Sequence, residues 1–321
     1  MAFSRVLAGL VAASCMPAQG DAGDMTGLIA TSRLLLDDLA RQGTRSGISG
    51  YLPDYVPALA KANPQEFAAA VQAVDGRSWD RSPPGRRVVL MSVMKPLLLF
   101  YALALLGPEV VSSLVGCQPS AKAYNDLDQL LEDAGHPRNP MLNSGALALA
   151  GALPGTTARD RVRRFQAWLY RETNCLMPVN ETVLASVQSL PNGRNRALVQ
   201  ALVDSGRVAE PEIALEIYNR LCCLGITMPE LAALGCWFAN PPSQWAELVQ
   251  QTLAAITVGG LYQDSETWMA RVGWPTKSGV SGVVWSIQPG QGSIACYSPL
   301  LNPQGHSILG LDFVEGAIRW F

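Results

Sequence analysis

Charge and histidine are the two things that this sequence has little of. Only 16% of its 321 residues are charged, the formal net charge is −2, and the two histidines are His136 and His306. A balance so close to neutral argues against a nucleic-acid partner or an anionic membrane surface. Two histidines leave few ligands for zinc. Both look like loop residues without a carboxylate at motif spacing, so we assign them no chemistry and expect no metal.

Paired cysteines and phosphate-binding loops are also missing. The seven cysteines are odd in number, none forms a C-x-x-C pair, and Cys222 and Cys223 are adjacent. This number and spacing of cysteines favour a reduced, cytoplasmic protein over one stabilised by disulfide bonds. The chain carries no glycine-rich nucleotide or flavin fingerprint, so we expect no cofactor.

The N-terminus leaves one alternative to a cytoplasmic location. Residues 1–20 contain Arg5, a short apolar run over Val6–Ala13 and small residues before Cys15. This outline resembles a weak secretory or lipoprotein signal, which would mean export. A disordered extension over residues 1–27, ahead of a second candidate start at Met25, explains the segment equally well.

Hydrophobic residues, by contrast, are plentiful. They make up 49% of the chain, enough for a sizeable core, and we expect one large domain over residues 28–321. The low net charge tolerates self-association, and we expect a homo-oligomer, either a dimer or a tetramer. The apolar run Val88–Leu106 is long enough to cross a bilayer. It holds Lys95 and Pro96 near its middle, however, so a buried core helix is the better interpretation and we expect no membrane partner.

Strand patterns fall near both ends of the chain. Phe67–Val74 and Arg87–Leu90 flank the turn signal at Asp75 and Gly76, and we expect two antiparallel strands joined by a long return. From Gly273 onward short β runs are separated by glycines. These runs are Gly282–Ile287, Ser293–Tyr297 and the weaker Ser307–Leu311.

Helical patterns occupy the middle. An apolar stripe predicts a first helix over residues 28–47. Residues 92–258 alternate helical runs with polar breaks, and we expect the tail Asp312–Phe321 to be helical. A sheet part from residues 65–90 and 259–321, beside a mainly helical insertion, indicates an α+β fold.

The sharpest local signal is the S-x-x-K run from Ser92 to Lys95. Three-residue spacing places both side chains on one helix face. Pro96 is tolerated only if the helix has just begun, which places Ser92 near the positive helix end. Apolar neighbours disfavour the ammonium form of Lys95, so its neutral amine could accept the serine proton. The alternative is a chance tetrapeptide.

A second motif, Lys277-Ser278-Gly279, precedes a predicted strand about 180 residues later. Serine hydrolases of the β-lactamase type carry a similar K-[ST]-G on the strand that lines their site. The order of the two motifs, with the nucleophile first, makes a chance match harder to accept.

Further segments after about residue 47 resemble the glutaminase family. They are Tyr55–Ala60, Val74–Gly76, Met91–Pro96, Val115–Ser120, Pro137–Ala146, Tyr218–Cys222, Gly260–Tyr262, Val272–Val280, Tyr297–Leu300 and Gly305–Ser307. The P-R-N-P-x-x-N-x-G-A run over Pro137–Ala146 is the most family-specific of them.

This resemblance implies a β-lactamase/transpeptidase-like fold with an antiparallel sheet flanked by helices. It implies a glutaminase that hydrolyses L-glutamine to glutamate and ammonia. Ser92 would be the acylated nucleophile, Lys95 its base and Tyr262 a proton relay, with the amides of Ser92 and Val280 as the oxyanion hole. The residues implied to bind substrate are Tyr55, Ser92, Asn143, Gln188, Asn195, Tyr218, Tyr262 and Val280. Taken singly, the tyrosines could be ordinary half-buried residues and the asparagines helix caps.

Gln188 marks a departure from the family. The family has a glutamate seven residues before the asparagine that matches Asn195, and that glutamate would pair with the substrate ammonium. Gln188 stands there in this chain, and a neutral amide binds an ammonium about tenfold more weakly. Glu181 would compensate if the loop differs. Two alternatives stay open: a β-lactamase or DD-peptidase, and a catalytically silent binding protein on the same fold.

Overall fold

The computed structural model describes residues 33–42 and 49–321. The expected N-terminal extension over residues 1–27 lies outside them, as do parts of the helix expected over residues 28–47. Residues 33–42 are helical. Leu36 and Ala40 are fully buried there, and Asp37 accepts a hydrogen bond from Trp79 Nε1 at 3.0 Å. Part of the apolar stripe therefore faces the protein core, whereas Leu34 is exposed.

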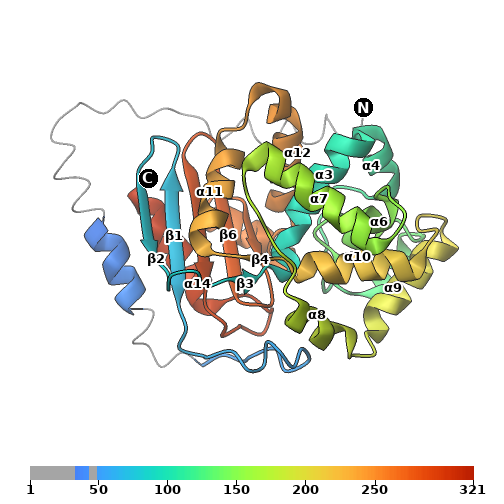
Figure 1. Cartoon of the computed structure of the whole chain (residues 1–321), viewed down its shortest axis with the longest axis horizontal. Helices are drawn as coiled ribbons and strands as arrows, with labels where there is room; N and C mark the ends of the chain where they lie inside the picture. The colour runs from blue at the N-terminus through green and yellow to red at the C-terminus, as the bar shows by residue number, and fades with distance from the viewer. Residues whose placement is uncertain (1–32, 43–48) are drawn as a thin grey trace.

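One five-stranded antiparallel sheet joins the two ends of the chain (Figure 1). Its strands, in spatial order, are β2 (Ser78–Arg81), β1 (Ala68–Ala73), β7 (Gly292–Tyr297), β6 (Val283–Gln288) and β5 (Thr276–Ser278). The pairing of β1 with β7 closes the sheet between segments that are more than two hundred residues apart. Strands from both ends of the chain, as predicted, thus form one layer.

The expected partner of the first strand is wrong. β1 pairs with β2 across the Asp75-Gly76 turn, whereas β3 (Val88–Val89) pairs with β4 (Gly225–Ile226) in a separate two-stranded sheet. Arg77 donates its backbone N–H to Asp75 Oδ1 at 3.0 Å, which tightens the turn. Prolines cannot donate ladder hydrogen bonds, so the Pro83-Pro84 pair takes the chain out of the main sheet before β3.

Alternation along the strands divides the hydrophobic core into two. On β7, Ala295 and Tyr297 belong to the larger cluster, and Ile294 and Cys296 to the smaller one. Successive strand residues point to opposite faces, so both faces of the sheet are covered. Helix α11 (Met228–Ala239) lies in front of the sheet in Figure 1 and α14 (Ile308–Ala317) behind it.

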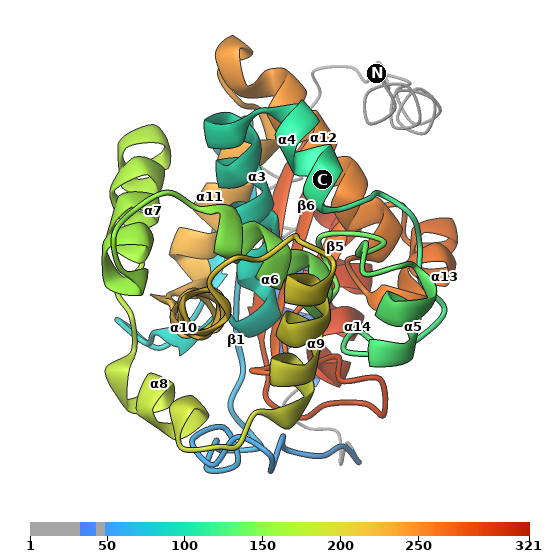
Figure 2. The same cartoon turned by 90° about the vertical axis from the view of Figure 1, so that its right-hand side faces the viewer.

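Helices fill the chain between β3 and β5, as predicted. They are α3 (Met94–Leu106), α4 (Pro108–Leu114), α5 (Leu127–Glu132), α6 (Asn143–Ala152), α7 (Ala158–Thr173), α8 (Glu181–Gln188), α9 (Gly193–Asp204), α10 (Pro211–Cys222), α11, α12 (Ala246–Gly259) and α13 (Ser265–Arg271). Short 3-10 turns are η1 (Met91–Val93), η2 (Ser243–Trp245), η3 (Tyr262–Asp264) and η4 (Ile318–Trp320). Figure 2 shows α3 passing inside the group formed by α6, α7, α10 and α12.

Helix α3 is the buried helix predicted for the long apolar run. Its residues from Met94 to Leu103 are all buried, and Pro96 lies in its first turn, where the missing N–H breaks no helical bond. In residues 33–42 and 49–321, no helix is both long and apolar enough to span a membrane. The six cysteines of this part of the chain are free thiols.

The C-terminal segment corrects one strand and confirms one helix. Ser307 caps α14 by accepting a hydrogen bond from the Gly310 N–H at 3.1 Å, so the weak strand pattern over Ser307–Leu311 is the start of a helix. The tail over Asp312–Phe321 is helical, as expected.

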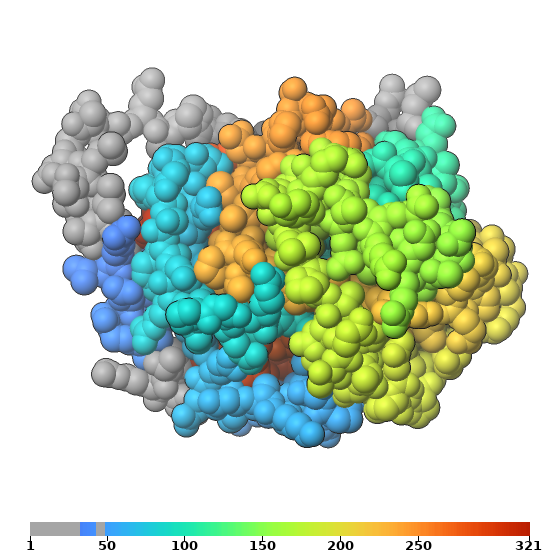
Figure 3. All heavy atoms as spheres, in the orientation of Figure 1, coloured from blue at the N-terminus to red at the C-terminus, as the bar shows by residue number. Residues whose placement is uncertain are grey.

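Residues 49–66 form an irregular segment along one edge of the molecule. Figure 3 shows this segment, in blue, in contact with the region of α8. The Ala58 N–H donates to Ser186 Oγ at 3.0 Å, which ties the two together. The segment thereby brings Tyr55 to the cavity described next.

Candidate active site

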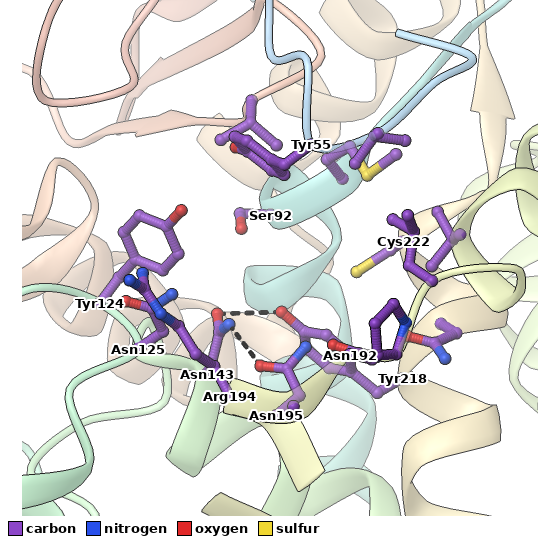
Figure 4. Close-up of a pocket in the computed structure, with 18 residues that line it drawn as sticks. Tyr55, Ser92, Tyr124, Asn125, Asn143, Asn192, Arg194, Asn195, Tyr218 and Cys222 are labelled. Atoms are coloured by element: carbon purple, nitrogen blue, oxygen red, sulfur yellow. Dashed lines mark hydrogen bonds between the residues drawn. The ribbon is translucent and has the colours of Figure 1, made fainter. Parts of the chain in front are cut away.

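Ser92 lies on the wall of a cavity of about 600 Å³ (Figure 4). It belongs to η1, directly ahead of α3, and it is 7% exposed. Met91, the residue before it, has a φ of +45°, in the left-handed region that side chains rarely adopt. Such strained residues cluster at functional sites. The segment therefore presents a serine hydroxyl to the cavity at the start of a buried helix.

Lys95 is completely buried one helical turn after Ser92. Its Nζ donates to the Met141 carbonyl at 2.8 Å and to Asn143 Oδ1 at 2.7 Å. No carboxylate is among these partners, and burial lowers the pKa of Lys95 from 10.5 to about 7. The amine is thus neutral in a large fraction of molecules near neutral pH, as a general base must be.

The P-R-N-P run shapes the loop that holds Lys95. Asn139 is 1% exposed, and its Oδ1 accepts the Met141 N–H at 3.0 Å while its Nδ2 donates to the Gln118 carbonyl at 2.7 Å. A side chain on Gly145 would collide with the Asn139 carbonyl, since its Cβ would lie 2.3 Å away. This close packing explains the G in the motif and aims the Met141 carbonyl at the lysine.

Asn143 connects the lysine to the substrate side of the cavity. Its Oδ1 accepts from Lys95 and from the Tyr218 hydroxyl at 2.9 Å, and its Nδ2 donates to Asn195 Oδ1 at 2.9 Å. Figure 4 shows these bonds joining side chains from α6, α9 and α10. Burial raises the pKa of Tyr218, so its hydroxyl stays a donor. The three helices thus build one polar wall.

Tyr262 lies between two buried amines. Its ring centroid is 5.6 Å from Lys95 Nζ and 4.4 Å from Lys277 Nζ, and its hydroxyl is 3.3 Å from the latter. Burial raises the pKa of Tyr262, and its hydrogen bond with Ser92 opposes that rise. Its φ of +56° is a second strained backbone angle beside the site. A neutral phenol in contact with the serine can relay a proton.

Lys277, the lysine of the second motif, anchors this tyrosine. Its Nζ also donates to the Gly260 carbonyl at 2.9 Å and to the Ser278 carbonyl at 2.6 Å. Burial, and then repulsion from Lys95, hold the pKa of Lys277 well below its usual value. The sequence predicts the motif itself, whereas the contact of Lys277 with Tyr262 depends on the fold.

Gly279 lets the end of β5 approach the serine. A Cβ on it would lie 2.5 Å from the Leu90 carbonyl oxygen and 3.3 Å from the Ser92 backbone nitrogen. Only glycine fits at such a distance. The backbone that continues to Val280, a residue of the cavity wall, therefore runs directly beside the Ser92 amide.

The structure gathers most of the expected residues around this cavity. Tyr55, Ser92, Asn143, Asn195, Tyr218 and Val280 line it, while Lys95 and Tyr262 lie buried behind Ser92. Gln188 is not on its wall. Gln188 lines a neighbouring depression with Arg196, Glu212 and Glu216, and Leu190 and Arg194 take part in the cavity instead.

His306 lies in the loop directly ahead of α14, as the sequence predicts. It is completely buried, its Nδ1 is 2.6 Å from Ser278 Oγ, and its Nε2 is 3.4 Å from an Asp264 carboxylate oxygen. Burial, with repulsion from Lys277, lowers the pKa of His306 to about 4, so the ring is neutral. It supports the strand that carries Lys277. In residues 33–42 and 49–321, no three histidine, cysteine or acidic side chains gather into a group that could hold a metal ion.

The two buried lysines predict that the unfolding free energy rises with pH. Between about pH 7 and 9 the unfolded chain keeps both amines protonated, whereas the folded protein, with lowered pKa values for Lys95 and Lys277, binds fewer protons. Stability should then increase by up to about 1.4 kcal/mol per pH unit for each lysine. Urea unfolding at pH 7, 8 and 9 measures this slope.

Two variants test the origin of that slope. Lys95→Met is expected to lose the share of one lysine, and Lys122→Met, at an exposed lysine paired with Glu132, to keep the wild-type slope. Equal slopes in the wild type and Lys95→Met would contradict the prediction.

Comparisons with known proteins agree with this geometry. A family model described as Glutaminase matches residues 50–319. The Glutaminase of Synechocystis sp. is 37% identical and covers 84% of this chain and 83% of its own length. The Glutaminase of Sinorhizobium fredii is 33% identical and covers 90% of this chain and 95% of its own length.

Solved structures give the same match. The probable glutaminase ybaS has a TM-score of 0.83 at 28% identity, covering 93% of this chain and 97% of that chain. A Bacillus glutaminase, crystallised in the presence of 4.3 M NaCl, has a TM-score of 0.77 at 25% identity over 88% and 96%. The α+β, β-lactamase-like fold expected from the sequence is confirmed.

Proposed function

The chain belongs to the glutaminase family of amide-cleaving hydrolases, and from this premise we propose that it hydrolyses L-glutamine through an acyl-enzyme on Ser92. One observation carries the mechanism: a completely buried amine, Lys95, follows one helical turn after a serine that faces the cavity. Deprotonated lysine is a competent base for a serine hydroxyl.

Acylation begins with Ser92 Oγ. The oxygen attacks the side-chain carboxamide carbon of glutamine while Lys95 accepts its proton. The amides of Ser92 and Val280 would stabilise the resulting oxyanion, and one such donor contributes about 3 kcal/mol in acyl-transfer enzymes. Support comes from the close passage of Gly279 beside the Ser92 nitrogen.

Release of ammonia requires a proton on the amide nitrogen. Tyr262, which bonds Ser92, would pass the proton held by Lys95 to that nitrogen as the C–N bond breaks. A Ser92 glutamyl ester and ammonia result. Water then attacks the ester carbonyl, Lys95 takes its proton and returns it to Ser92 Oγ, and glutamate leaves.

The polar wall suits the amino-acid part of the substrate. Asn195 and Tyr218 are held in place by Asn143, and Tyr55, 46% exposed, stands at the cavity rim. The fixed amide and hydroxyl groups offer donors to the α-carboxylate. The free thiols of the described cysteines support a reducing, cytoplasmic setting for the reaction.

Ammonia and glutamate release from millimolar L-glutamine by the purified protein tests the proposal. L-asparagine and a chromogenic β-lactam are assayed in parallel. Turnover of glutamine without β-lactam hydrolysis is the expected outcome. β-Lactam hydrolysis without glutamine turnover would assign the site to the alternative hydrolase class, and silence towards all three substrates would assign the chain to the binding-protein alternative.

A further inference from the structure

The cavity in front of Ser92 is larger than a single amino acid needs. Its volume is about 600 Å³, and cavities of ~300–1,000 Å³ hold ligands of drug size. Glutamine would occupy the part nearest Ser92 and Asn143. The remaining space, towards the loop between α8 and α9, has no role in the proposed reaction.

That remaining space has an apolar wall. Val187, Leu190 and Pro191 come from the end of α8 and the loop after it. Val187 and Leu190 pack against the main core, which holds them in place. Binding of a hydrocarbon group against this wall is favourable, because apolar surface is removed from water. The apolar side chains offer no hydrogen-bond acceptor or negative charge to an ammonium group.

The positive charge among the cavity-lining residues favours an anionic substrate. Among the lining residues in the described part of the chain, Arg194 is the only charged one, and it comes from the first turn of α9, next to Asn195 (Figure 4). Glu212 and Glu216 line the neighbouring depression, which shares Val187, Leu190, Asn192 and Asn219 with the cavity, and both are paired with arginines. Glu212 there bonds Arg196 at 2.6 Å and Glu216 bonds Arg220 at 2.9 Å.

We propose that the site takes N-acyl-L-glutamine in preference to free L-glutamine. The inference rests on the proposed function and specifies its substrate class. Acylation removes the α-ammonium charge, for which the wall provides no carboxylate, and adds a hydrocarbon tail for Val187, Leu190 and Pro191. The α-carboxylate faces Arg194, and a bidentate guanidinium–carboxylate pair orients it. Hydrolysis of the side-chain amide is unchanged and yields N-acyl-glutamate and ammonia.

The first test compares three substrates with the same carboxamide. Ammonia release is measured for L-glutamine, N-acetyl-L-glutamine and N-butyryl-L-glutamine. We expect kcat/KM to be at least about tenfold higher for the N-acetyl compound than for glutamine, and to rise further by about fourfold for each methylene that is buried. Values for both acyl compounds at or below that of glutamine would overturn the inference but leave the proposed function standing. Failure of all three would remove both.

The second test introduces a negative charge into the apolar wall. Leu190→Glu is expected to raise kcat/KM for glutamine, relative to N-acetyl-L-glutamine, by about tenfold or more, because the new carboxylate pairs with the ammonium. Leu190→Gln has the same shape without the charge and should leave that ratio within about threefold of the wild type. An equal ratio in the two variants would overturn the inference.

The third test concerns the carboxylate. Arg194→Gln is expected to raise KM by about tenfold for all three substrates, since each carries the same α-carboxylate, with a smaller effect on kcat. An unchanged KM would overturn the assignment of Arg194.

Discussion

Ser92→Ala is expected to lower kcat for ammonia release from L-glutamine by at least about 10⁴-fold. Alanine cannot form the ester, and the remaining groups can only activate water against an amide. In serine hydrolases, removal of the nucleophile alone costs about 10⁶-fold, and the residual rate comes from the oxyanion hole and binding. A coupled glutamate assay with a sensitive ammonia readout covers this range.

The matched control for that variant is Ser298→Ala. Ser298 is completely buried, its hydroxyl has no hydrogen-bond partner in the described structure, and it does not line the cavity. It should keep kcat within about threefold. Thermal unfolding of both variants near the wild-type midpoint shows that the fold is intact. A Ser92→Ala protein with more than a hundredth of the wild-type rate would rule out the acyl-enzyme.

The proposed nucleophile and its base could be located from the sequence because their signal is local. Ser92 and Lys95 are three residues apart, in the 3-10 turn η1 and the first turn of α3, and Pro96 is compatible only with a helix that begins there. Burial of Lys95 follows from the apolar run around it. No long-range information is needed for any of these steps, and the structure places all of them as expected.

Pairings that depend on distant segments could not be predicted in the same way. β3 finds its partner in β4, more than 130 residues later, and only the folded helical region brings β4 there. The polar, glycine-rich neighbours of His306 predict a loop, which the structure confirms, but they do not predict that the side chain is buried. Its burial comes from the strand that carries Ser278 and from the η3 turn, neither of which is adjacent in sequence.

The position of Gln188 shows a third limit. Counting seven residues back from Asn195 assumes the family loop length, yet α8 ends at Gln188 and Asn192 adopts a left-handed φ of +49° before α9. The chain turns in between, so Arg194 lines the cavity, Gln188 lines the adjoining depression, and Leu190 lines both. Which residues of a loop face the cavity depends on the backbone dihedral angles of that loop. A count of residues does not give these angles.

Lys95→Met is expected to lower kcat/KM for L-glutamine by about 10³–10⁴-fold, because methionine fills a similar volume but cannot accept the Ser92 proton. Lys122→Met, which removes an exposed lysine, should keep the wild-type value. Lys95→Arg separates two roles. It restores a buried cation that can donate to Met141 and Asn143, but guanidinium does not deprotonate in proteins, so we expect it to stay inactive.

The pH profile of the wild type gives an independent measurement of the same base. Since burial lowers the pKa of Lys95 to about 7, kcat/KM should rise tenfold per pH unit below about pH 7 and level off above it, as the amine loses its proton. The residual activity of Lys95→Met should lack this step. A flat wild-type profile from pH 5.5 to 8.5, or an active Lys95→Arg enzyme, would mean that Lys95 acts as a positive charge and not as the base.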